Sequence, residues 1–214
     1  VNKEDSLLAQ AAENHLWIKA GVETQITNKS FVNTVALLNL LATKLESGNY
    51  QQTLKILYDI AEWIDQYMRS IEVNLIPQAN FVQGINHIDL LADGPSYSAA
   101  LQGGLVFREG PKIFSTACTT ADYAHGWDKA GKPGLVAVLH SPHYTSGSVD
   151  DKIINSLTAK GVKVILITNQ TVPEREAVIV IPHPTVPESL AIIPQIIITS
   201  TLMGWLMGEK SDRE

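Results

Sequence analysis

The stretch LVAVLHSPHYTSGSVDDKIINSLTAKGVKVILIT, residues 135–168, decides the fold class. It contains two apolar runs, Leu135–His140 and Val162–Thr168, with a helix-like run at Val149–Lys160 between them. Successive residues of both runs are apolar, which indicates strands that are buried on both faces. A strand, a helix and a second strand in this order are typical of a parallel sheet that helices cover on both sides.

The same alternation extends in both directions from this stretch. The other strand-like runs are Ile88–Ala92, Ile113–Ala117 and Ala177–Ile181, and the other helix-like runs are Tyr97–Glu109, part of Thr120–Lys129 and Glu188–Met207. Five strands with interleaved helices predict a flavodoxin-like, doubly wound α/β domain with a five-stranded parallel sheet.

The beginning of the chain looks like the end of another such unit. His15–Ala20 reads as a short strand after a helix over roughly Ser6–Glu13, and apolar residues at helical spacing predict helices over Phe31–Leu45 and Gln52–Ile71. We expect three parts: residues 1–50 as the C-terminal part of a first domain, 51–86 as a linker helix and loop, and 87–214 as the second domain.

Composition excludes several classes of protein. The 214 residues are 45% hydrophobic and 18% charged, which excludes a disordered chain. The net charge of −6 makes nucleic acid and anionic membranes unfavourable as partners, because both are negatively charged. The one cysteine, Cys118, excludes an internal disulfide and fits a reducing, cytoplasmic location. The N-terminus does not resemble a signal peptide, and Val1 in place of Met indicates a processed start or a fragment.

One segment has the length of a membrane span. Ser189–Gly208 carries no charge, and about 20 apolar residues suffice to cross a bilayer. Pro194 and Gln195 interrupt its apolar character, and no cluster of Lys or Arg flanks it. These features favour a buried C-terminal helix over a membrane helix.

Doubly wound sheets bind ligands beyond the carboxyl ends of their strands. Three loops qualify here, at residues 93–96, 141–149 and 169–174. In the second loop, Ser146 and Ser148 precede a helix N-terminus that could hold a phosphate. The favoured alternative is an ordinary capped loop, because Asp150 and Asp151 at the helix start would repel an anion.

Glu109 is a candidate general base. It follows Leu101 and Leu105 at helical spacing, so its carboxylate continues an apolar stripe at the negative end of a helix. Both features disfavour ionisation and would raise the pKa of Glu109 toward that of a working general base. The alternative is a terminal glutamate in water beside Arg108 or Lys112. This helix ends near the amino ends of the strands, so a catalytic Glu109 would serve a site formed with another domain.

The six histidines show no metal-binding spacing, and we expect neither a metal nor a redox cofactor. His125 precedes Gly126 in a polar segment that suits an exposed imidazole, although a lone histidine is more often an ordinary surface residue. His140 ends a strand and is expected to be structural, whereas His143 lies in a candidate ligand loop. No nucleophile elbow, nucleoside-triphosphate loop or dinucleotide motif is present in the sequence.

Several short motifs together resemble a known family. Gly94-Pro95-Ser96-Tyr97, Ala100-Leu101-Gln102-Gly103, Arg108-Glu109 and His125-Gly126 follow one another with the order and spacing of the sugar isomerase (SIS) domain, specifically the second copy in the isomerase half of glucosamine-6-phosphate synthases. Gly21-Val22-Glu23 and Thr27–Phe31 resemble the loop that ends the first copy, and Pro182-His183 resembles the end of the second. The resemblance covers nearly the whole chain.

The resemblance implies a function. In this family the glutamate that matches Glu109 moves a proton between C1 and C2 of an open-chain sugar phosphate, and the histidine that matches His125 assists ring opening from the neighbouring subunit. It implies a homodimer with shared sites and no cofactor. The expected contacts to the phosphorylated sugar are Gly94, Ser96, Tyr97, Thr27, Asn28, Lys29, Ser146 and Ser148.

The chain also departs from the family pattern. Val106 stands where the family has a lysine, Gln102 where it has a glutamate, and Trp127 where it has a proline. The S-x-S-G-x-T phosphate loop of the first copy and the synthase's C-terminal tail lysine are missing. These departures favour a deglycase for fructosamine (Amadori) sugar 6-phosphates, a deaminase or an isomerase over a synthase. The alternatives are a non-catalytic phosphosugar-binding regulatory module and a truncated, inactive fragment.

Overall fold

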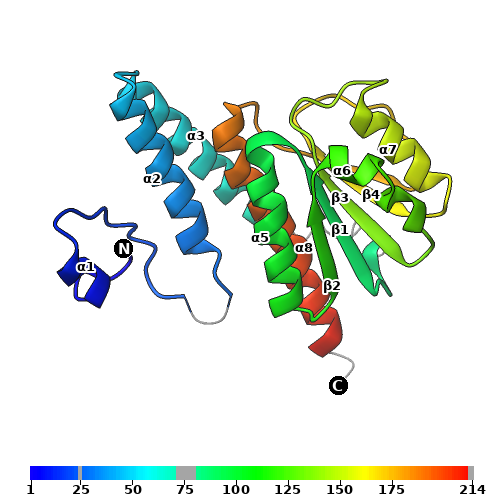
Figure 1. Cartoon of the computed structure of the whole chain (residues 1–214), viewed down its shortest axis with the longest axis horizontal. Helices are drawn as coiled ribbons and strands as arrows, with labels where there is room; N and C mark the ends of the chain where they lie inside the picture. The colour runs from blue at the N-terminus through cyan, green and yellow to red at the C-terminus, as the bar shows by residue number, and fades with distance from the viewer. Residues whose placement is uncertain (24–25, 71–80, 212–214) are drawn as a thin grey trace. The chain divides into compact units, whose positions relative to one another are not determined.

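The computed structural model describes residues 1–23, 26–70 and 81–211 (Figure 1). The chain divides into two compact units, unit 1 at Val1–Asp59 and unit 2 at Ile60–Glu214. Part of the linker predicted at residues 51–86, including the last residue of its helix, lies outside the described residues.

Unit 2 is built on the predicted five-stranded sheet. Its strands are β1 (His87–Ala92), β2 (Phe114–Cys118), β3 (Leu135–His140), β4 (Lys163–Thr168) and β5 (Val178–Pro182). They pair in the order β2-β1-β3-β4-β5, and every pair is parallel. The predicted doubly wound α/β class is confirmed.

Helices connect and cover these strands. They are the 3-10 turn η1 (Gly94–Ser96), α5 (Tyr97–Glu109), α6 (Thr120–Ala124), the 3-10 turn η2 (Trp127–Ala130), α7 (Val149–Thr158) and α8 (Glu188–Ser211). The helix expected within Thr120–Lys129 is two short pieces, because Gly126 between them has φ +148°, far from a helical value.

The strand order places the helices on opposite faces of the sheet. The connection from β1 to β2 moves toward one edge, whereas those from β2 to β3 and from β3 to β4 move toward the other. Because such crossovers are right-handed, α5 lies on one face, and α6 and α7 lie on the other. Figure 1 shows this separation, with α8 beside α5.

A glycine brings α5 close to the sheet. A Cβ atom added to Gly103 would lie 2.4 Å from Cδ2 of Leu90 on β1 and 3.0 Å from Cγ2 of Thr199 on α8. At the next position, Gly104, the nearest atom would be the Cβ of Ala117 at 3.6 Å, an ordinary contact. Only Gly103 is therefore required by this packing.

We predict opposite effects of alanine at these two positions. Gly103→Ala should lower the free energy of unfolding by about 1–3 kcal/mol, because the added methyl overpacks a closed contact. Gly104→Ala should leave stability unchanged or raise it by up to about 1 kcal/mol, because alanine favours the helix. Urea unfolding of both variants tests this, and equal losses in the two would contradict the packing described.

Helix α8 is long and apolar enough to cross a membrane by length and composition, yet 72% of its 18-residue apolar window is buried inside the protein. This supports the expected buried C-terminal helix. Thr199 of α8 lies 2.9 Å from Nε2 of His140, at the end of β3. Burial lowers the pKa of His140 to about 3, and the nearby His183 contributes in the same direction.

His140 should make stability fall in mild acid. The folded chain keeps this imidazole neutral, whereas the unfolded chain takes up a proton below the ordinary pKa near 6.5. Stability is therefore lost as the pH falls from 6.5 toward 3, and His140 accounts for about 2 kcal/mol of that loss at pH 5. Urea unfolding at pH 7 and pH 5 should show a smaller difference for His140→Gln.

The exposed His143, with 72% of its side chain accessible, provides the control. His143→Gln should keep the pH dependence of the unmodified chain. An unchanged pH dependence in His140→Gln would show that His140 is not held neutral by the fold.

Unit 1 is helical. It holds α1 (Leu7–Ala11), α2 (Lys29–Leu45) and the first part of α3 (Tyr50–Arg69), close to the predicted helices. No residue of α2 is buried, and Leu45 is 76% exposed. The apolar stripe predicted on this helix is thus left largely uncovered within the described chain.

The strand predicted at His15–Ala20 is wrong. This segment has no regular structure, and its backbone bonds instead to the start of the chain. The amide of Ile18 donates to the carbonyl of Val1 at 2.8 Å, and the amino group of Val1 donates to the carbonyl of Leu16 at 2.7 Å. A strand needs a partner strand for its hydrogen bonds, and unit 1 supplies none in the described chain.

Candidate functional site

Glu109 is the last residue of α5, at the amino edge of the sheet. Directly after it, the amide of Gly110 closes the helix on the carbonyl of Val106 at 2.8 Å. The amide of Ile113 then bonds the carbonyl of Phe107 at 3.1 Å as the chain enters β2. The predicted position of this helix end, away from the carboxyl ends of the strands, is confirmed.

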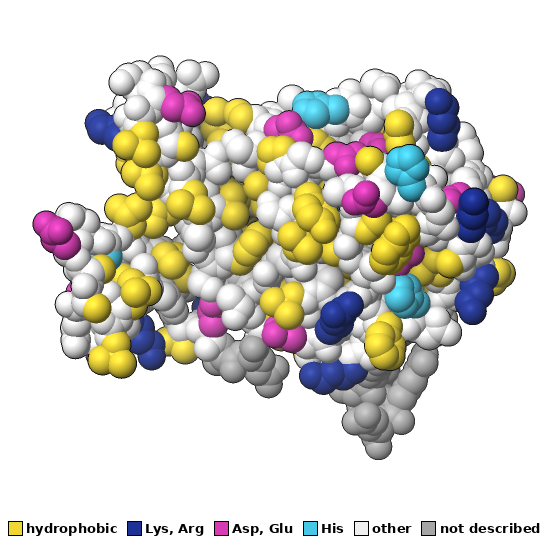
Figure 2. Space-filling model, viewed as in Figure 1, with side chains coloured by type: hydrophobic (Ala, Val, Ile, Leu, Met, Phe, Trp, Pro, Cys, Tyr) yellow, Lys and Arg dark blue, Asp and Glu magenta, His cyan; other side chains and the backbone are white. Residues whose placement is uncertain are grey.

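The apolar stripe that was expected to lead to Glu109 does not face the core. Leu101 and Leu105 are 49% and 45% exposed, and Glu109 is exposed on the same side of the helix. Figure 2 shows hydrophobic side chains on this outer surface of α5. The buried face consists mainly of small residues: Ala99, Ala100, Gly103, Gly104, Val106 and Phe107.

The two cations beside Glu109 are engaged with other atoms. Arg108 donates to the carbonyl and to the hydroxyl of Ser115 on β2, in each case from Nε at 3.1 Å. Lys112 donates from Nζ to the backbone carbonyl of Glu109 at 2.7 Å. Among the residues that the structure describes, none forms a hydrogen bond or an ion pair with the Glu109 carboxylate. The Glu109 carboxylate is therefore an exposed acceptor, at the end of a helix that the Arg108–Ser115 bonds hold to the sheet.

His125 ends the short helix α6 and is also exposed. The hydroxyl of Thr119 accepts a hydrogen bond from the amide of Asp122 and so caps the start of α6. The hydroxyl of Tyr123 donates to Asp89 on β1 at 2.8 Å, which fastens the same helix to the sheet. The imidazole is thus presented to solvent from an anchored turn.

Glu109 and His125 are not brought together within unit 2. Glu109 belongs to α5 and His125 to α6, which lie on opposite faces of the sheet (Figure 1). A reaction that needs both groups at one substrate therefore needs a second copy of the chain, or of a similar domain, to supply one of them.

Gly94 and Ser96 lie at the switch point of the sheet, beyond the carboxyl end of β1. Gly94 has φ +54°, and a Cβ there would lie 2.8 Å from Oε1 of Glu188. Ser96 is fully buried, and its hydroxyl has no hydrogen-bond partner in the described chain. Tyr97, which begins α5, is partly exposed.

The loop before α7 uses its polar groups internally. The hydroxyl of Ser148 accepts from the amide of Asp151 at 3.2 Å, and the amide of Gly147 donates to the Asp151 carboxylate at 2.8 Å. Arg175 pairs with Asp151 at 2.6 Å. The Tyr144 hydroxyl bond and the Gly147 amide lower the pKa of Asp151 to about 2. Ser146, by contrast, is exposed.

The rest of the switch point is acidic. Burial, and then the negative charges of Asp150 and Asp122, raise the pKa of Asp93. The carboxylate of Glu188 lies next to Gly94 at the same switch point. Its Oε2 lies 3.9 Å from Nε2 of His143. An anion would meet carboxylates here, which supports the capped-loop interpretation over a phosphate site at Ser146 and Ser148.

The loop before α2 in unit 1 is occupied by a glutamate. Glu23 accepts hydrogen bonds from the amides of Asn28 at 2.8 Å and Lys29 at 2.7 Å, and from the hydroxyl of Ser30 at 2.5 Å. Desolvation opposes ionisation of Glu23, yet these bonds hold its pKa below the ordinary value. Thr27 and the Lys29 side chain are exposed beside this capped helix start.

Sequence reasoning did not single out one arrangement on β1. His87 and Asp89 lie two positions apart on one face of the strand, with Nε2 of His87 2.9 Å from Oδ1 of Asp89. A charged residue within an otherwise apolar strand is the signal that could have drawn attention to this pair. Other side chains near it come from β2, from η2 and, at Lys132, from the loop before β3.

Comparison with known proteins agrees with this fold. No family model matches the chain. A glutamine–fructose-6-phosphate aminotransferase (isomerizing) of Rhizobium meliloti is 23% identical over 178 residues, which cover 79% of this chain and 29% of that protein. The C-terminal domain of the Francisella tularensis glucosamine-fructose-6-phosphate aminotransferase superposes with a TM-score of 0.82 at 21% identity, over 98% of this chain and 62% of that one.

Two further structures share the architecture. A glucosamine-6-phosphate deaminase of Thermotoga maritima gives a TM-score of 0.76 at 19% identity, over 98% of this chain and 60% of that one. The tagatose-6-phosphate ketose/aldose isomerase of Escherichia coli gives 0.64 at 17% identity, over 87% and 51%. The chain therefore has the fold of the sugar isomerase (SIS) proteins, as its motifs predicted, and spans about two thirds or less of each of these relatives.

Proposed function

We propose that this chain is part of a phosphosugar-processing enzyme that acts on an amino or Amadori sugar 6-phosphate. Glu109 transfers a proton between C1 and C2 of the open-chain sugar, and His125 of a second copy assists ring opening. Water then hydrolyses the resulting imine, so the products are a sugar phosphate and the amine of the fructosamine 6-phosphate, or ammonia where the substrate is an amino sugar. The reaction needs only acid and base, since an imine or carbonyl group beside the reacting carbon stabilises the carbanion.

The observation that carries this proposal is that no residue in the described part of the chain bonds to the Glu109 carboxylate. Arg108 and Lys112 both lie next to it, yet each is bonded to a backbone oxygen instead. An acceptor without a fixed cation can approach a C–H group and take its proton. Its place on a clamped helix end limits the positions it can reach, which favours proton transfer between two neighbouring carbons.

The partner in this proposal is a second copy in a homodimer, and the location is cytoplasmic. Exposed Leu101 and Leu105 on the same side of α5 as Glu109 suit a face that is covered on assembly. Gly94, Ser96, Tyr97, Thr27, Asn28, Lys29, Ser146 and Ser148 remain proposed contacts to the sugar phosphate. Among them, Ser146 and Ser148 have the weaker support because of the acidic surroundings described above.

The glutamate is tested by Glu109→Gln, which keeps the shape of the side chain and removes the base. Exchange of solvent deuterium into C1 of fructose 6-phosphate, followed by proton NMR, reports the proposed proton transfer directly. We expect the rate to fall by about 10²–10⁴-fold in Glu109→Gln while affinity for the sugar phosphate is kept. Glu62→Gln, at an exposed position of α3, is the matched control and should exchange normally.

Two results would contradict the proposal. Near-normal exchange in Glu109→Gln would exclude the glutamate as the base. Saturable binding of fructose 6-phosphate, glucosamine 6-phosphate and fructosamine 6-phosphate to the unmodified chain, without exchange or product from any of them, would exclude the enzyme.

The second of these results is the one expected for a regulatory module that binds phosphosugars without turnover. Val106 favours this alternative, because it is fully buried at the position of a family lysine and cannot present a charge. Trp127, 53% exposed where the family has proline, is the other departure beside a proposed catalytic group.

A further inference from the structure

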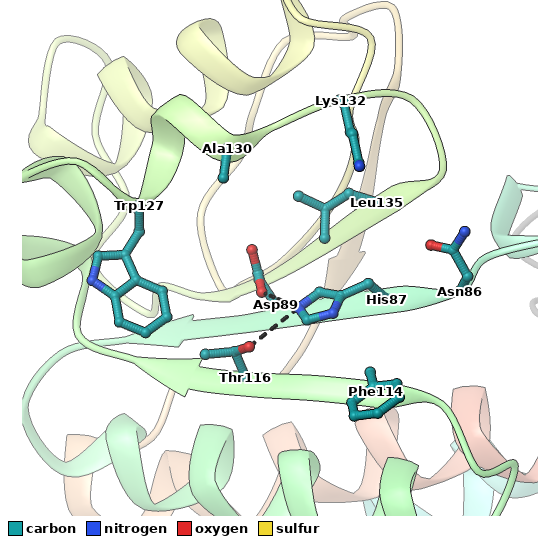
Figure 3. A pocket seen from close by; sticks show the side chains of 9 residues that line it. All are labelled: Asn86, His87, Asp89, Phe114, Thr116, Trp127, Ala130, Lys132 and Leu135. Carbon is teal, nitrogen blue, oxygen red and sulfur yellow. Dashed lines mark hydrogen bonds and ion pairs between the residues drawn. The ribbon is translucent and has the colours of Figure 1, made fainter.

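A cavity of about 570 Å³ lies on the face of the sheet opposite α5 (Figure 3). Most of this face is covered by α7, but between β2 and β3 the chain forms only the short α6 and η2. The amino-terminal halves of β1 and β2 are therefore left without a full helix above them. The size is in the range of pockets that hold small molecules, about 300–1,000 Å³.

A chain of hydrogen bonds runs from the core to the floor of this cavity. The buried Tyr123 donates from its hydroxyl to Oδ2 of Asp89 at 2.8 Å. Oδ1 of Asp89 lies 2.9 Å from Nε2 of His87, and the hydroxyl of Thr116 lies 3.1 Å from the same nitrogen. Asp89 is 10% exposed at its side chain, whereas that of His87 is 39% exposed. Both carboxylate oxygens are thus occupied, and the imidazole is more exposed in this cavity than the carboxylate is.

The carboxylate determines which nitrogen of His87 is available. An ionised carboxylate can only accept hydrogen bonds, so when the imidazole is neutral its proton lies on Nε2, between His87 and Asp89. Nδ1 is then an acceptor, and within the described residues no group donates to it. A ligand that fills this place must offer a hydroxyl or an N–H group.

The remaining lining specifies two further properties of a ligand. Figure 3 shows the Lys132 ammonium directed into the cavity from the loop before β3, where it is the cation among the lining residues. Trp127 and Phe114 present aromatic rings from η2 and from the start of β2, and are 53% and 76% exposed. A cation calls for an anionic group, and exposed aromatic rings pack well against the C–H face of a sugar.

We propose that this cavity binds a sugar phosphate. Lys132 faces the phosphate, Nδ1 of His87 accepts a hydrogen bond from a ring hydroxyl, and Trp127 packs against the ring. The sugar phosphate is either free or the ribose phosphate of a nucleotide. This second site does not depend on the proposed function, because it uses none of the residues assigned there and lies on the face opposite Glu109.

The test uses the indole N–H signal of Trp127 in the ¹⁵N-labelled full chain, assigned by its absence in Trp127→Phe. Glucose 6-phosphate and adenosine 5′-monophosphate are titrated separately, beside glucose and inorganic phosphate. We expect a saturable shift with at least one of the two sugar phosphates, and which of them binds identifies the source. Glucose and inorganic phosphate should each bind at least about tenfold more weakly, since each lacks part of the recognition.

Variants then show whether the Trp127 shift reports binding in this cavity. Lys132→Met and His87→Ala should each weaken the Kd by about tenfold or more, the value of a lost bond to a charged or buried partner. Lys132 lies in an exposed loop, so its variant remains informative if His87→Ala destabilises the sheet. Lys129→Met, on η2 but outside the cavity, and Glu109→Gln should bind as the unmodified chain does.

Three outcomes would overturn the proposal. The Trp127 signal could fail to move with either sugar phosphate at millimolar concentration. Inorganic phosphate could shift it with equal affinity, which would show simple anion binding at Lys132. Lys132→Met could bind as tightly as the unmodified chain, which would place the ligand elsewhere.

Discussion

The close contact of α5 with strand β1 is the constraint on which the position of Glu109 depends. Gly103 lets the helix approach until Leu90 and Thr199 would touch any side chain placed there. The far end of the helix is then held by the bonds from Arg108 to Ser115 at the start of β2. A helix seated less deeply would carry its last residue away from the sheet and release that clamp. The carboxylate of Glu109 is therefore placed by packing several residues before it.

The handedness of parallel strand connections determines that Glu109 and His125 lie on opposite faces of the sheet. Because β2 lies outside β1 and β3 lies on its inner side, the helices that follow β1 and β2 must cover opposite faces. Glu109 and His125 are separated by this rule and not by any local feature of their own. The same rule leaves the cavity over His87 on the α6 face. The switch point between β1 and β3 is acidic at Asp93, Asp150 and Glu188, and its loop is closed on Asp151.

The sheet could be predicted closely from the sequence, and the faces of its helices less well. Each strand is a short apolar run between polar or glycine-rich segments, so it can be recognised from its own residues alone. The face of α5 was misjudged because the core side carries Gly103, Gly104 and alanines, which give a weak apolar signal, whereas exposed Leu101 and Leu105 give a strong one. The strand prediction at His15–Ala20 was wrong because a strand needs a partner strand, which the residues of the segment itself do not determine.

The residues of the candidate site likewise differ in how well they could be predicted from the sequence. Glu109 and His125 could be singled out from motifs and from a helix end. The pairing of His87 with Asp89 could not, because Tyr123 and Thr116 complete it from other elements. The occupation of the α2 start by Glu23, and of the α7 start by Asp151, likewise follows from side-chain geometry that spacing alone does not determine.

In the proposed function, one catalytic centre needs Glu109 of one copy and His125 of another. Mixing the full-length variants Glu109→Gln and His125→Asn after joint unfolding and refolding tests it most directly. In a twofold dimer of the two variants, one of the two sites keeps both native groups. We expect each variant alone to be inactive in deuterium exchange at C1 of fructose 6-phosphate, and the mixture to regain part of the activity. A mixture that stays inactive, while the refolded unmodified chain exchanges normally, would contradict it.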